Sequence, residues 1–505
     1  MSRSLNSDNR VIPEIVARAE RHLERLAVVD GTGDHTYEQL LKSSAGAATA
    51  LLDGAGDLRE ARVAYMVTPS FDYVRAQWGI WRAGGVAAPL CLTHPRPELE
   101  YVLDDTRPIS VVAGPEFEDV LRPLAEDRGI RWLGLDDLHV DPGLLPAVEP
   151  DRRAMILYTS GTTGPPKGVV TTHRNISAQI RSLVEAWAWT PADRVLLTLP
   201  LHHVHGIVNV VSCALWSGAV CEMLPKFDAA DTWNRIASAP LTLYMAVPTI
   251  YHRLIETWER AEPDLARRLS LACQRLRLMV SGSAALPVPV LERWKEVSGH
   301  TLLERYGMTE IGMALSNPLH GQRRPGHVGS PLPGVEVRLA PEEGEAPAAG
   351  DLMEIQVRGE TVFLDYWGKP EATRDAFTID GWFKTGDMAV KDGDVYQILG
   401  RSSVDIIKSG GEKVSALEVE STLLGHPSVA ECAVVGMPDP EWGQRVVAAV
   451  VQAEDSPVDH DALKAWCRDR LAPYKVPKEF ITVDALPTNA MGKVNKPELV
   501  TMLGG

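Results

Sequence analysis

Short apolar runs alternate with longer amphipathic stretches through most of the chain. The runs are rich in β-branched residues and several end in Gly, Pro or Ser, as buried strands do. They cover residues 62–67, 109–114, 154–159, 194–200, 241–248 and 276–281. Helical periodicity between them is clearest over residues 173–187 and 288–297. This alternation predicts an α/β fold, in which parallel sheets are covered by helices.

The pattern changes near residue 334. Three further strand-like runs, 335–340, 353–359 and 395–400, are separated by turns instead of helices. They predict a smaller antiparallel or β-barrel-like subdomain over about residues 330–400. We therefore expect a large N-terminal domain over residues 1–400, in which this subdomain follows two helix-covered sheet subdomains.

Residues 401–505 have the pattern of a small α+β domain. Ser415-Ala-Leu-Glu418 has the form of a capping box that opens a helix ending near Gly425. The elements expected after it are strands at 429–436, 445–452 and 479–483 and a helix at 459–471. We expect this unit to be a separate, mobile C-terminal domain.

Composition and charge narrow the function classes. The chain has 505 residues, of which 45% are apolar and 23% are charged, as in an ordinary globular enzyme. Its 51 Lys and Arg against 67 Asp and Glu give a net charge of −16, which argues against binding of nucleic acid. An anionic substrate stays open, because a basic pocket can exist on an acidic protein. The most apolar stretch, 206–220, is interrupted by Asn and Ser and predicts a buried helix, not a membrane span.

The six cysteines are scattered, without C-x-x-C or metal-ligand spacing. We expect them to be reduced core residues, which points to the cytoplasm. Acidic residues at positions 8, 14 and 20 argue against an N-terminal transit peptide.

The strongest local motif is Tyr158-Thr-Ser-Gly-Thr-Thr-Gly-Pro-Pro-Lys-Gly168. Backbone N–H groups, hydroxyls and one lysine in such a loop can surround polyphosphate oxygens. It is not a Walker A loop, because Lys167 follows Pro166 and two prolines remove backbone donors. The order of hydroxyl residues, glycines and lysine favours a phosphate site over a surface turn. The predicted ATP-binding residues here are Thr159, Ser160, Gly161, Thr162, Thr163, Gly164 and Lys167.

This loop resembles the phosphate-binding signature of the adenylate-forming superfamily, which includes acyl-CoA synthetases, adenylation domains of peptide synthetases and luciferases. The resemblance covers almost the whole chain, because further signatures follow in the expected order. They are Tyr306-Gly-Met-Thr-Glu310, Lys384-Thr-Gly-Asp387, Gly400-Arg401 and Pro487-Thr-Asn-Ala-Met-Gly-Lys493.

The resemblance implies a role for each motif. Thr309 contacts phosphate, Glu310 helps to hold Mg²⁺, Asp387 binds the ribose hydroxyls with Arg401 nearby, and Lys493 serves adenylation. It also places Gly282, Ser283, Tyr306 and Gly307 at the nucleotide and His203 among the catalytic residues. ATP, Mg²⁺ and coenzyme A are the implied cofactors and co-substrates.

These residue types suit the implied chemistry. A carboxylate becomes a good electrophile when it forms a mixed anhydride with AMP, and two anions must then meet in a site that neutralises and aligns them. In the second half-reaction, CoA thiol attacks the acyl-adenylate. The resemblance implies that the C-terminal domain turns about a hinge and presents either Lys493 or the loop 408–413. The CoA and hinge set is Ser403, Lys408, Ser409, Gly410 and Gly411, with Ser403 at a position more often Asp or Lys.

Two clusters bear on the acid. His202-His203-Val-His205 follows one strand end, and Arg253 lies about one helical turn beyond another. Arg253 with His205 could bind a second carboxylate, whereas a fatty or aromatic acid favours an apolar pocket. Segments 247–254, 281–287, 304–319 and 405–420 closely resemble malonyl-CoA synthetases. This resemblance implies malonate, with methylmalonate as the alternative, and gives Met308 with Met313 as a short-pocket floor.

Three other interpretations stay open from the sequence. They are a CoA ligase for another short or aromatic acid, a free-standing adenylation enzyme that loads a carrier protein, and an inactive homologue that senses nucleotide. The chain end at residue 505, without a carrier segment, favours a stand-alone enzyme, and the presence of Lys167, Glu310, Asp387 and Lys493 favours an active one. We expect small-molecule substrates and neither a membrane nor a nucleic-acid partner.

Overall fold

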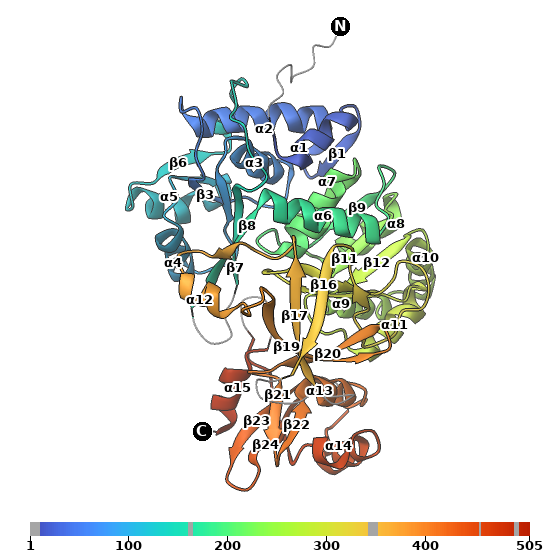
Figure 1. The fold of residues 1–505 in the computed structure, drawn as a ribbon. Helices are drawn as coiled ribbons and strands as arrows, with labels where there is room; N and C mark the ends of the chain where they lie inside the picture. The colour runs from blue at the N-terminus through green and yellow to red at the C-terminus, as the bar shows by residue number, and fades with distance from the viewer. Residues whose placement is uncertain (1–10, 160–164, 342–351, 454–455, 489–493, 505) are drawn as a thin grey trace.

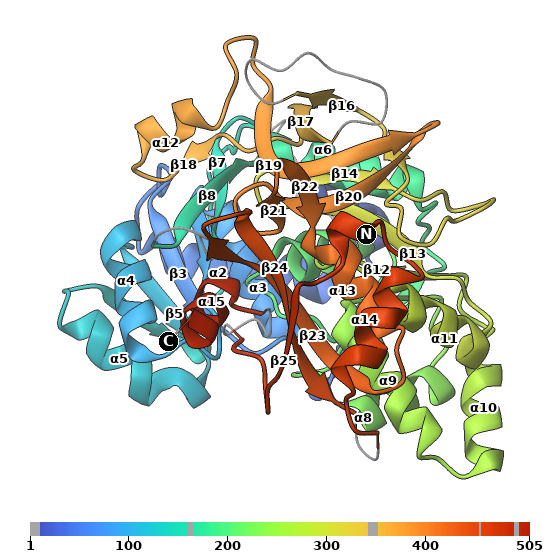
Figure 2. The ribbon, with the colours of Figure 1, turned by 90° about the horizontal axis from the view of Figure 1, so that it is seen from below.

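The computed structural model describes residues 11–159, 165–341, 352–453, 456–488 and 494–504. A large N-terminal part carries a small C-terminal part at one end (Figure 1). Seen from below, the C-terminal part lies in front of the middle of the larger one (Figure 2). Strand β20 runs to Arg401, across the predicted boundary at residue 400, which stays a prediction.

The first sheet has seven strands in the order β18-β8-β7-β4-β3-β5-β6. The five strands from β7 to β6 are parallel, and β8 and β18 are added antiparallel at one edge. The strands are β3 (Arg62–Met66), β4 (Val86–Pro89), β5 (Ser110–Ala113), β6 (Arg131–Gly134), β7 (Arg153–Thr159), β8 (Lys167–Thr172) and β18 (Asp365–Tyr366). Its helices are α2 (Tyr37–Leu52), α3 (Phe71–Arg82), α4 (Arg96–Thr106) and α5 (Glu118–Glu126).

The second sheet has nine strands in the order β15-β14-β13-β12-β11-β9-β10-β1-β2. Strands β13 to β1 are parallel, and the outer strands are antiparallel. The strands are β1 (Leu26–Asp30), β2 (Gly33–Thr36), β9 (Arg194–Leu197), β10 (Val220–Met223), β11 (Leu243–Ala246), β12 (Leu278–Ser281), β13 (Leu303–Met308), β14 (Gly312–Ser316) and β15 (Ser330–Pro331). Neighbouring helices are α1 (Glu14–Ala19), α6 (His173–Ala186), α7 (Cys213–Trp216), α8 (Ala229–Ser238), α9 (Pro248–Glu259), α10 (Pro263–Cys273) and α11 (Val288–Ser298).

One continuous apolar core joins these two sheets, and five fully buried tryptophans are its largest members. They are Trp78, Trp81, Trp187, Trp233 and Trp294. The parallel sheets covered by helices therefore confirm the predicted α/β class. The prediction missed the antiparallel edge strands, of which β8 matters most because it turns the glycine–threonine loop into a hairpin connection between β7 and β8.

The smaller third sheet is antiparallel, as predicted, in the order β16-β17-β19-β20. Over the described residues no ladder pairs β16 with β20, so strand pairing does not close it into a barrel. The strands are β16 (Val335–Ala340), β17 (Met353–Gly359), β19 (Phe383–Asp392) and β20 (Val395–Arg401), and helix α12 (Pro370–Asp375) lies before β19.

The C-terminal part is the predicted α+β unit with its own apolar core. Ser415 caps α13 by accepting a bond from Glu418 N, but the reciprocal bond of a capping box is absent because the Glu418 carboxylate binds Lys475 at 2.7 Å. The strands are β21 (Ile406–Ser409), β22 (Glu412–Ser415), β23 (Val429–Asp439), β24 (Gly443–Gln452) and β25 (Glu479–Thr482). The helices are α13 (Ala416–Leu424), α14 (His460–Arg468) and α15 (Lys496–Gly504).

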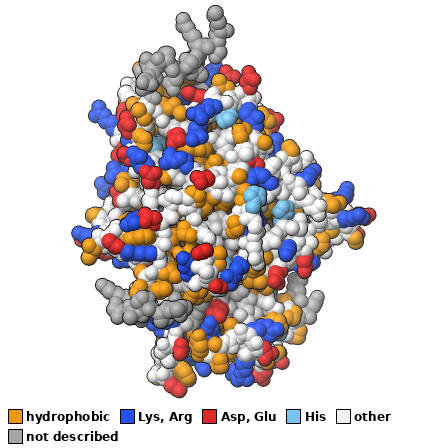
Figure 3. Space-filling model, turned by 45° about the vertical axis from the view of Figure 1, so that its right-hand side comes forward, with side chains coloured by type: hydrophobic (Ala, Val, Ile, Leu, Met, Phe, Trp, Pro, Cys, Tyr) orange, Lys and Arg blue, Asp and Glu red, His pale blue; other side chains and the backbone are white. Residues whose placement is uncertain are grey.

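The predicted buried helix 206–220 is buried over residues 206–219, but it is a π-helical segment, His205–Ser212, followed by the short α7, and Val220 already begins β10. Ser212 donates its hydroxyl hydrogen to the carbonyl of Ile207, five residues back, at 2.7 Å. Within the part of the chain that the structure describes, no helix combines the length and apolar character needed to cross a bilayer. On the face in Figure 3, Lys and Arg are interspersed with Asp and Glu.

Glu304 is a buried carboxylate on β13, where it accepts a bond from Gly326 N at 3.2 Å. Burial raises the pKa of Glu304 from 4.5 to about 8. Between these two pH values the folded chain keeps a proton that the unfolded chain has released, so stability falls as pH rises.

We expect Glu304→Gln to remove this loss of stability. The difference in melting temperature between Glu304→Gln and the wild type should shift in favour of the variant as pH rises from 5 to 8, because the amide never ionises. Thermal unfolding over this range, with the exposed Glu126→Gln as control, measures the effect. Equal pH dependence in wild type and Glu304→Gln would contradict it.

Candidate active site

Lys167, Tyr366 and Glu310 form one half of a charged cluster beside the β7–β8 hairpin. The Lys167 ammonium lies 4.9 Å from the centre of the Tyr366 ring, and the Tyr366 hydroxyl donates to Glu310 Oε1 at 3.0 Å. Glu310 sits in the connection between β13 and β14, and burial raises its pKa even though the Tyr366 bond opposes the shift. A cation and a buried carboxylate therefore both contact Tyr366.

Tyr306, Asp387 and Arg401 form the other half. The Tyr306 hydroxyl donates to Asp387 Oδ2 at 2.6 Å, and Arg401 Nε donates to Asp387 Oδ1 at 3.0 Å. Asp387 and Arg401 face each other across the β19–β20 ladder, so the register of the third sheet fixes their pairing. The positive charge of Arg401 also acts on Glu310, which joins the two halves electrostatically.

A bulge at Tyr306/Gly307 bends the end of β13 toward this cluster. A Cβ on Gly307 would lie 2.1 Å from the Gly312 carbonyl oxygen, so the close approach requires glycine. Beyond the bulge, Met308 is half-buried, and Thr309 lines a small hollow together with Asn175 and Gln179. The central motif is therefore placed by a β-bulge, which the sequence did not reveal.

Several predicted residues lie outside the described part of the chain: Ser160, Gly161, Thr162, Thr163, Gly164 and Lys493. The described residues on either side of segment 160–164 are well anchored. Thr159 and Lys167 face each other in the β7–β8 ladder, and the Tyr101 hydroxyl donates to the Pro166 carbonyl at 2.8 Å. This hairpin base brings Lys167 to the Tyr366–Glu310 pair.

A second group, Arg305, Ser283 and His205, lies at the ends of β12 and β13 and the start of the π-helical segment. Arg305 Nη2 donates to Ser283 Oγ at 3.3 Å, and Ser283 Oγ is 3.1 Å from His205 Nδ1. Ser283 has a left-handed φ of 71°, and a Cβ on Gly282 would lie 2.5 Å from Arg305 Cζ. The backbone is thus shaped around the guanidinium.

Arg305 is a buried cation without a counter-charge among the residues that the structure describes. Burial lowers the pKa of Arg305 to about 9, and no carboxylate opposes this shift. Over the same residues, Arg305 Nε and His205 Nε2 have no hydrogen-bond partner. A buried, unpaired guanidinium is costly unless an anion binds to it, and its planar donors suit a carboxylate.

Two of the neighbouring histidines, His202 and His205, are held neutral. Burial lowers the pKa of His202 to about 2, with the nearby His203 and His94 adding to the shift. The same causes, burial first and then Arg305 and His203, take the pKa of His205 well below its usual value. The His202 and His203 rings are 4.0 Å apart, with His203 half-buried. Neutral imidazoles leave Arg305 as the cation of this group.

The structure does not bring Arg253 into this group. Arg253 is exposed on α9, and over the described residues its guanidinium has no hydrogen bond or ion pair, while Tyr251 and Leu254 carry the buried face of the helix. Sequence reasoning selected Arg253, which stays a prediction, and did not single out Arg305. The available signal was an arginine inside the buried strand pattern 303–308, where a charge needs a partner.

The predicted CoA loop is a tight hairpin between β21 and β22. Gly410 and Gly411 both have positive φ, 61° and 87°, as a two-residue hairpin turn requires. Gly410 N donates to the Trp442 carbonyl at 2.8 Å, and a Cβ on Gly410 would lie 2.7 Å from the Trp442 ring. Lys478 lies 4.4 Å from the centre of the Trp442 ring, which is partly exposed. Sequence reasoning missed this aromatic surface.

Lys408 at this hairpin is exposed and Ser409 is buried. The hinge segment is held by Asp405, two residues beyond the exposed Ser403. Asp405 Oδ2 accepts from Arg401 N at 3.1 Å, and Oδ1 pairs with Lys496 at 2.6 Å. Lys496 also pairs with Glu420 at 2.7 Å, so the hinge is tied to α13 and α15. Asp405 and Lys496, not Ser403, make the contacts here.

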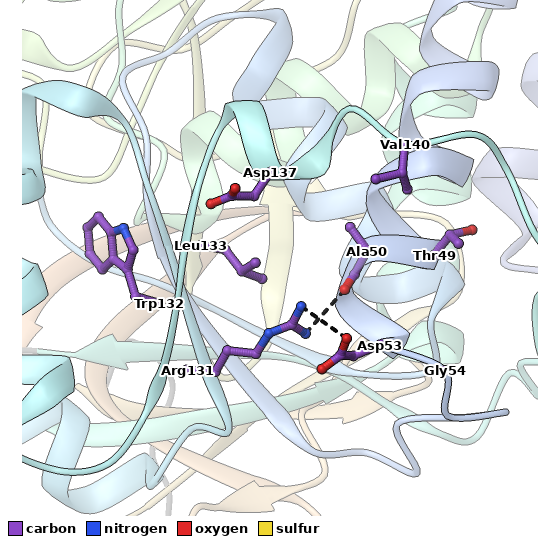
Figure 4. Close-up of a pocket in the computed structure, with 9 residues that line it drawn as sticks. All are labelled: Thr49, Ala50, Asp53, Gly54, Arg131, Trp132, Leu133, Asp137 and Val140. Atoms are coloured by element: carbon purple, nitrogen blue, oxygen red, sulfur yellow. Dashed lines mark hydrogen bonds and ion pairs between the residues drawn. The ribbon is translucent and has the colours of Figure 1, made fainter.

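A separate groove lies between α2 and β6, in the first sheet's helix layer (Figure 4). Its polar groups are paired within the protein. Arg131 contacts Asp53 at 3.5 Å and the Ala50 carbonyl at 3.2 Å, and Asp137 accepts from Gly134 N at 2.8 Å. This groove shares no residue with the charged cluster or with the Arg305 group.

In the described part of the chain, no three His, Cys, Asp or Glu side chains are grouped to hold a metal ion. Glu310 offers one buried carboxylate, and its Oε1 is oriented by Tyr366. One carboxylate together with substrate phosphates is a usual protein contribution to Mg²⁺. The residues present therefore fit an ion that binds together with a nucleotide.

The chain belongs to the AMP-binding enzyme family, which matches residues 15–367, while the AMP-binding enzyme C-terminal domain matches residues 418–493. Mitochondrial malonate–CoA ligase ACSF3 of Bos taurus is 49% identical over 97% of this chain and 90% of its own length. The ATP-bound crystal structure of MatB from Rhodopseudomonas palustris covers 97% of this chain and 99% of its own, with 35% identity and a TM-score of 0.88. A malonyl-CoA ligase complex with methylmalonyl-CoA and AMP covers 92% of this chain and 97% of its own, with 39% identity and a TM-score of 0.67.

We expect Arg305→Met to stabilise the ligand-free protein, on the order of 1–3 kcal/mol, because it removes a buried cation that has no counter-charge. Arg253→Met on the exposed face of α9 should change stability little. Urea unfolding of both variants measures the difference. A lower unfolding free energy for Arg305→Met would mean that the cation is compensated in the free protein.

Proposed function

We propose that this protein is an ATP-dependent acid–thiol ligase that makes malonyl-CoA from malonate, ATP and CoA through malonyl-AMP. The observation that carries the choice of acid is the buried Arg305 guanidinium, which lacks a counter-charge and contacts Ser283. The 49% identity to a malonate–CoA ligase over nearly the whole chain supports the same choice.

In the first half-reaction one malonate oxygen attacks the α-phosphorus of ATP, a P–O bond forms, and the bond to pyrophosphate breaks. Lys167 and Lys493 offset the negative charges that meet, and Asp387 receives the ribose hydroxyls while Tyr306 and Arg401 orient it. Thr159 and the loop residues 160–164 surround the phosphates, with Gly282, Gly307 and Thr309 beside them. Glu310 would hold Mg²⁺, which neutralises phosphate charge when bound.

The second malonate carboxylate does not react with ATP; the protein binds it to select the substrate. Arg305 can donate two N–H bonds to it, and the Ser283 hydroxyl and neutral His205 complete a polar cradle. Arg253 stays a candidate ligand of the second carboxylate and Met308 a candidate for the floor of this pocket, and methylmalonate is the nearest alternative substrate. A monocarboxylate or an aromatic acid would leave the Arg305 cation unpaired, which disfavours both.

In the second half-reaction the CoA sulfur attacks the acyl carbon, the thioester bond forms, and AMP leaves with its oxygen. The thiol proton must be accepted by a base, and His203, the histidine inferred to be catalytic, is the candidate for this role. Trp442, with Lys478 over its ring, provides an exposed surface beside the Gly410–Gly411 turn for the pantetheine arm. A carrier protein with the same arm is the alternative acceptor.

The two half-reactions require two placements of residues 401–505 relative to residues 1–400. The ATP-bound relative matches with a TM-score of 0.88 at 35% identity, whereas the product complex reaches 0.67 at the higher identity of 39%. The lower score at higher identity supports a different domain placement in the product complex. We infer that the arrangement described here, which matches the ATP-bound relative better, corresponds to adenylation.

We infer a reducing compartment, and from the sequence the cytoplasm. All six cysteines are free, as expected for such a compartment. The bovine relative is named as mitochondrial, so cell fractionation with antibody detection is the direct test.

A panel of acids in a pyrophosphate-release assay with ATP and CoA tests the proposed substrate. Malonate should be preferred over acetate, succinate and benzoate. Arg305→Met should lower kcat/KM for malonate by about 100-fold or more, because a desolvated ion pair is lost in the transition state. The kcat/KM of Arg253→Ala for malonate measures whether α9 contributes to recognition of the acid. A preference for acetate or benzoate by the wild type would refute the malonate assignment.

We expect Lys493→Ala to abolish most malonyl-AMP formation yet to leave CoA attack on pre-formed malonyl-AMP nearly intact, because Lys493 serves only the first half-reaction. Separate assays of the two steps, with Lys408→Ala as the matched variant for the second, measure this split. Equal losses in both steps would contradict two domain placements.

A further inference from the structure

Helix α6 begins directly after β8 and so follows the glycine–threonine hairpin without a connecting loop. Two of its side-chain amides, Asn175 and Gln179, are one helical turn apart and therefore lie on the same face of the helix. Both residues line the small hollow that Thr309 also lines. Neither belongs to a motif selected from the sequence, and neither has a part in the proposed mechanism.

Gln179 fixes the chain shortly after Glu310. Its Oε1 accepts a hydrogen bond from Met313 N at 2.6 Å, although the two residues are 134 positions apart in the chain. The contact requires glycine at position 312, because a Cβ there would lie 1.6 Å from Gln179 Oε1 and the φ of Gly312 is left-handed at 63°. The start of β14 is therefore held against α6 by a buried side chain as well as by strand pairing.

Asn175 holds the segment 360–366, which runs from the end of β17 into β18. Its Oδ1 accepts from Thr172 N at 2.8 Å and completes the capping box of α6. Its Nδ2 donates to the carbonyls of Glu360 and Val362, at 2.8 Å and 2.9 Å. One amide thus joins the first turn of α6 to this segment.

Segment 360–366 in turn holds Glu310 at two points. Phe363 N donates to the Glu310 carbonyl at 2.7 Å, and the Tyr366 hydroxyl donates to Glu310 Oε1 at 3.0 Å. A shift of this segment would therefore displace both the backbone and the carboxylate of Glu310. Through Asn175 and Gln179, the helix that follows the phosphate loop controls the position of the buried carboxylate.

The hollow beside Thr309 also contains polar atoms that the described protein does not satisfy. Gln179 Nε2 and Thr361 Oγ1 are buried and have no hydrogen-bond partner among the described residues. Both residues line the hollow. Buried polar atoms of this kind are costly unless a water molecule or a ligand oxygen reaches them. This second observation indicates that the Gln179 face of α6 serves a ligand site and not only the core.

We propose that Gln179 and Asn175 are positioning residues that hold the Thr309–Glu310 turn where the Glu310 carboxylate can bind Mg²⁺ together with the nucleotide phosphates. The inference rests on the proposed function, which gives Glu310 that role. Each amide acts through a hydrogen bond to the backbone that carries or contacts Glu310. Loss of a group that orients a metal ligand typically lowers metal affinity or activity by about 10–100-fold.

Two substitutions separate this role from the stability of the helix. Gln179→Met has a similar size and removes the acceptor for Met313 N. Asn175→Asp keeps the oxygen that caps α6, and its charge suits a helix N-terminus, but it removes both donor bonds to segment 360–366. Ser182→Ala is the matched control, because Ser182 is buried on the same helix and its hydroxyl has no partner among the described residues.

Calorimetric titration with α,β-methylene-ATP, which cannot form an adenylate, measures nucleotide binding in Mg²⁺ and in EDTA. Binding by the wild type should be tighter in Mg²⁺. This gain should shrink by about tenfold or more in Gln179→Met and in Asn175→Asp, with the affinity in EDTA nearly unchanged. Ser182→Ala should keep the full gain. An equal loss of affinity in Mg²⁺ and in EDTA would contradict a role through Glu310.

Glu310→Gln distinguishes failure of this inference from failure of the proposed function. If Glu310→Gln loses the Mg²⁺ gain and the two α6 variants keep it, the positioning role is wrong and the role of Glu310 stands. If Glu310→Gln keeps the gain, the Mg²⁺ role in the proposed function is wrong, and the inference fails with it.

Separate assays of the two half-reactions exclude a general structural defect. In Gln179→Met and Asn175→Asp, malonyl-AMP formation should fall by about tenfold or more, whereas the KM for malonate and CoA attack on pre-formed malonyl-AMP should stay near the wild-type values. Circular dichroism checks folding of each variant. Equal losses in both half-reactions would overturn the proposal.

Discussion

The arrangement of this protein depends on one constraint, the two hydrogen bonds that Asp387 accepts from Tyr306 and Arg401. Tyr306 belongs to β13 of the nine-stranded sheet, whereas Asp387 and Arg401 belong to the third sheet, and Arg401 is the last residue before the predicted hinge. One carboxylate therefore ties these two sheets together at the start of the predicted hinge. Because Asp387 is also the residue that binds ribose in the proposed mechanism, the nucleotide would meet a group already oriented by the fold.

Charge distribution in the site follows one rule: each buried charge is either paired or kept for a ligand. Asp387 and Lys496 are paired within the protein, whereas Glu310 and Arg305 are buried with incomplete compensation. In the proposed mechanism, the desolvation cost of these two groups would be offset when Mg²⁺, nucleotide and diacid bind. Binding and specificity then arise from the same desolvated groups.

Much of this could be predicted from the sequence, and the gaps have physical reasons. Strands such as β3 and β12 follow from β-branched runs, and the glycine-rich and Gly-Met-Thr-Glu motifs follow from local residue order. Strand β8 was missed because it begins directly after two prolines, inside a motif that was interpreted as a loop. For Arg305 the sequence shows an arginine inside a buried strand pattern, but whether packing supplies a counter-charge cannot be read from it. Arg253 illustrates the converse, since a helical position alone does not fix which face looks inward.

The Asp405 anchor has a mechanical consequence. Arg401 is fixed on Asp387 and Asp405 is fixed on Lys496, so only residues 402–404 separate the two attachment points. A linker of three residues strongly restricts translation of the C-terminal part relative to the N-terminal part. Rotation between the two parts is confined to the few backbone dihedrals of this linker. Movement of the C-terminal part between its two proposed placements would then be a switch between two defined orientations. Its rate would depend on how quickly these ion pairs break and form again.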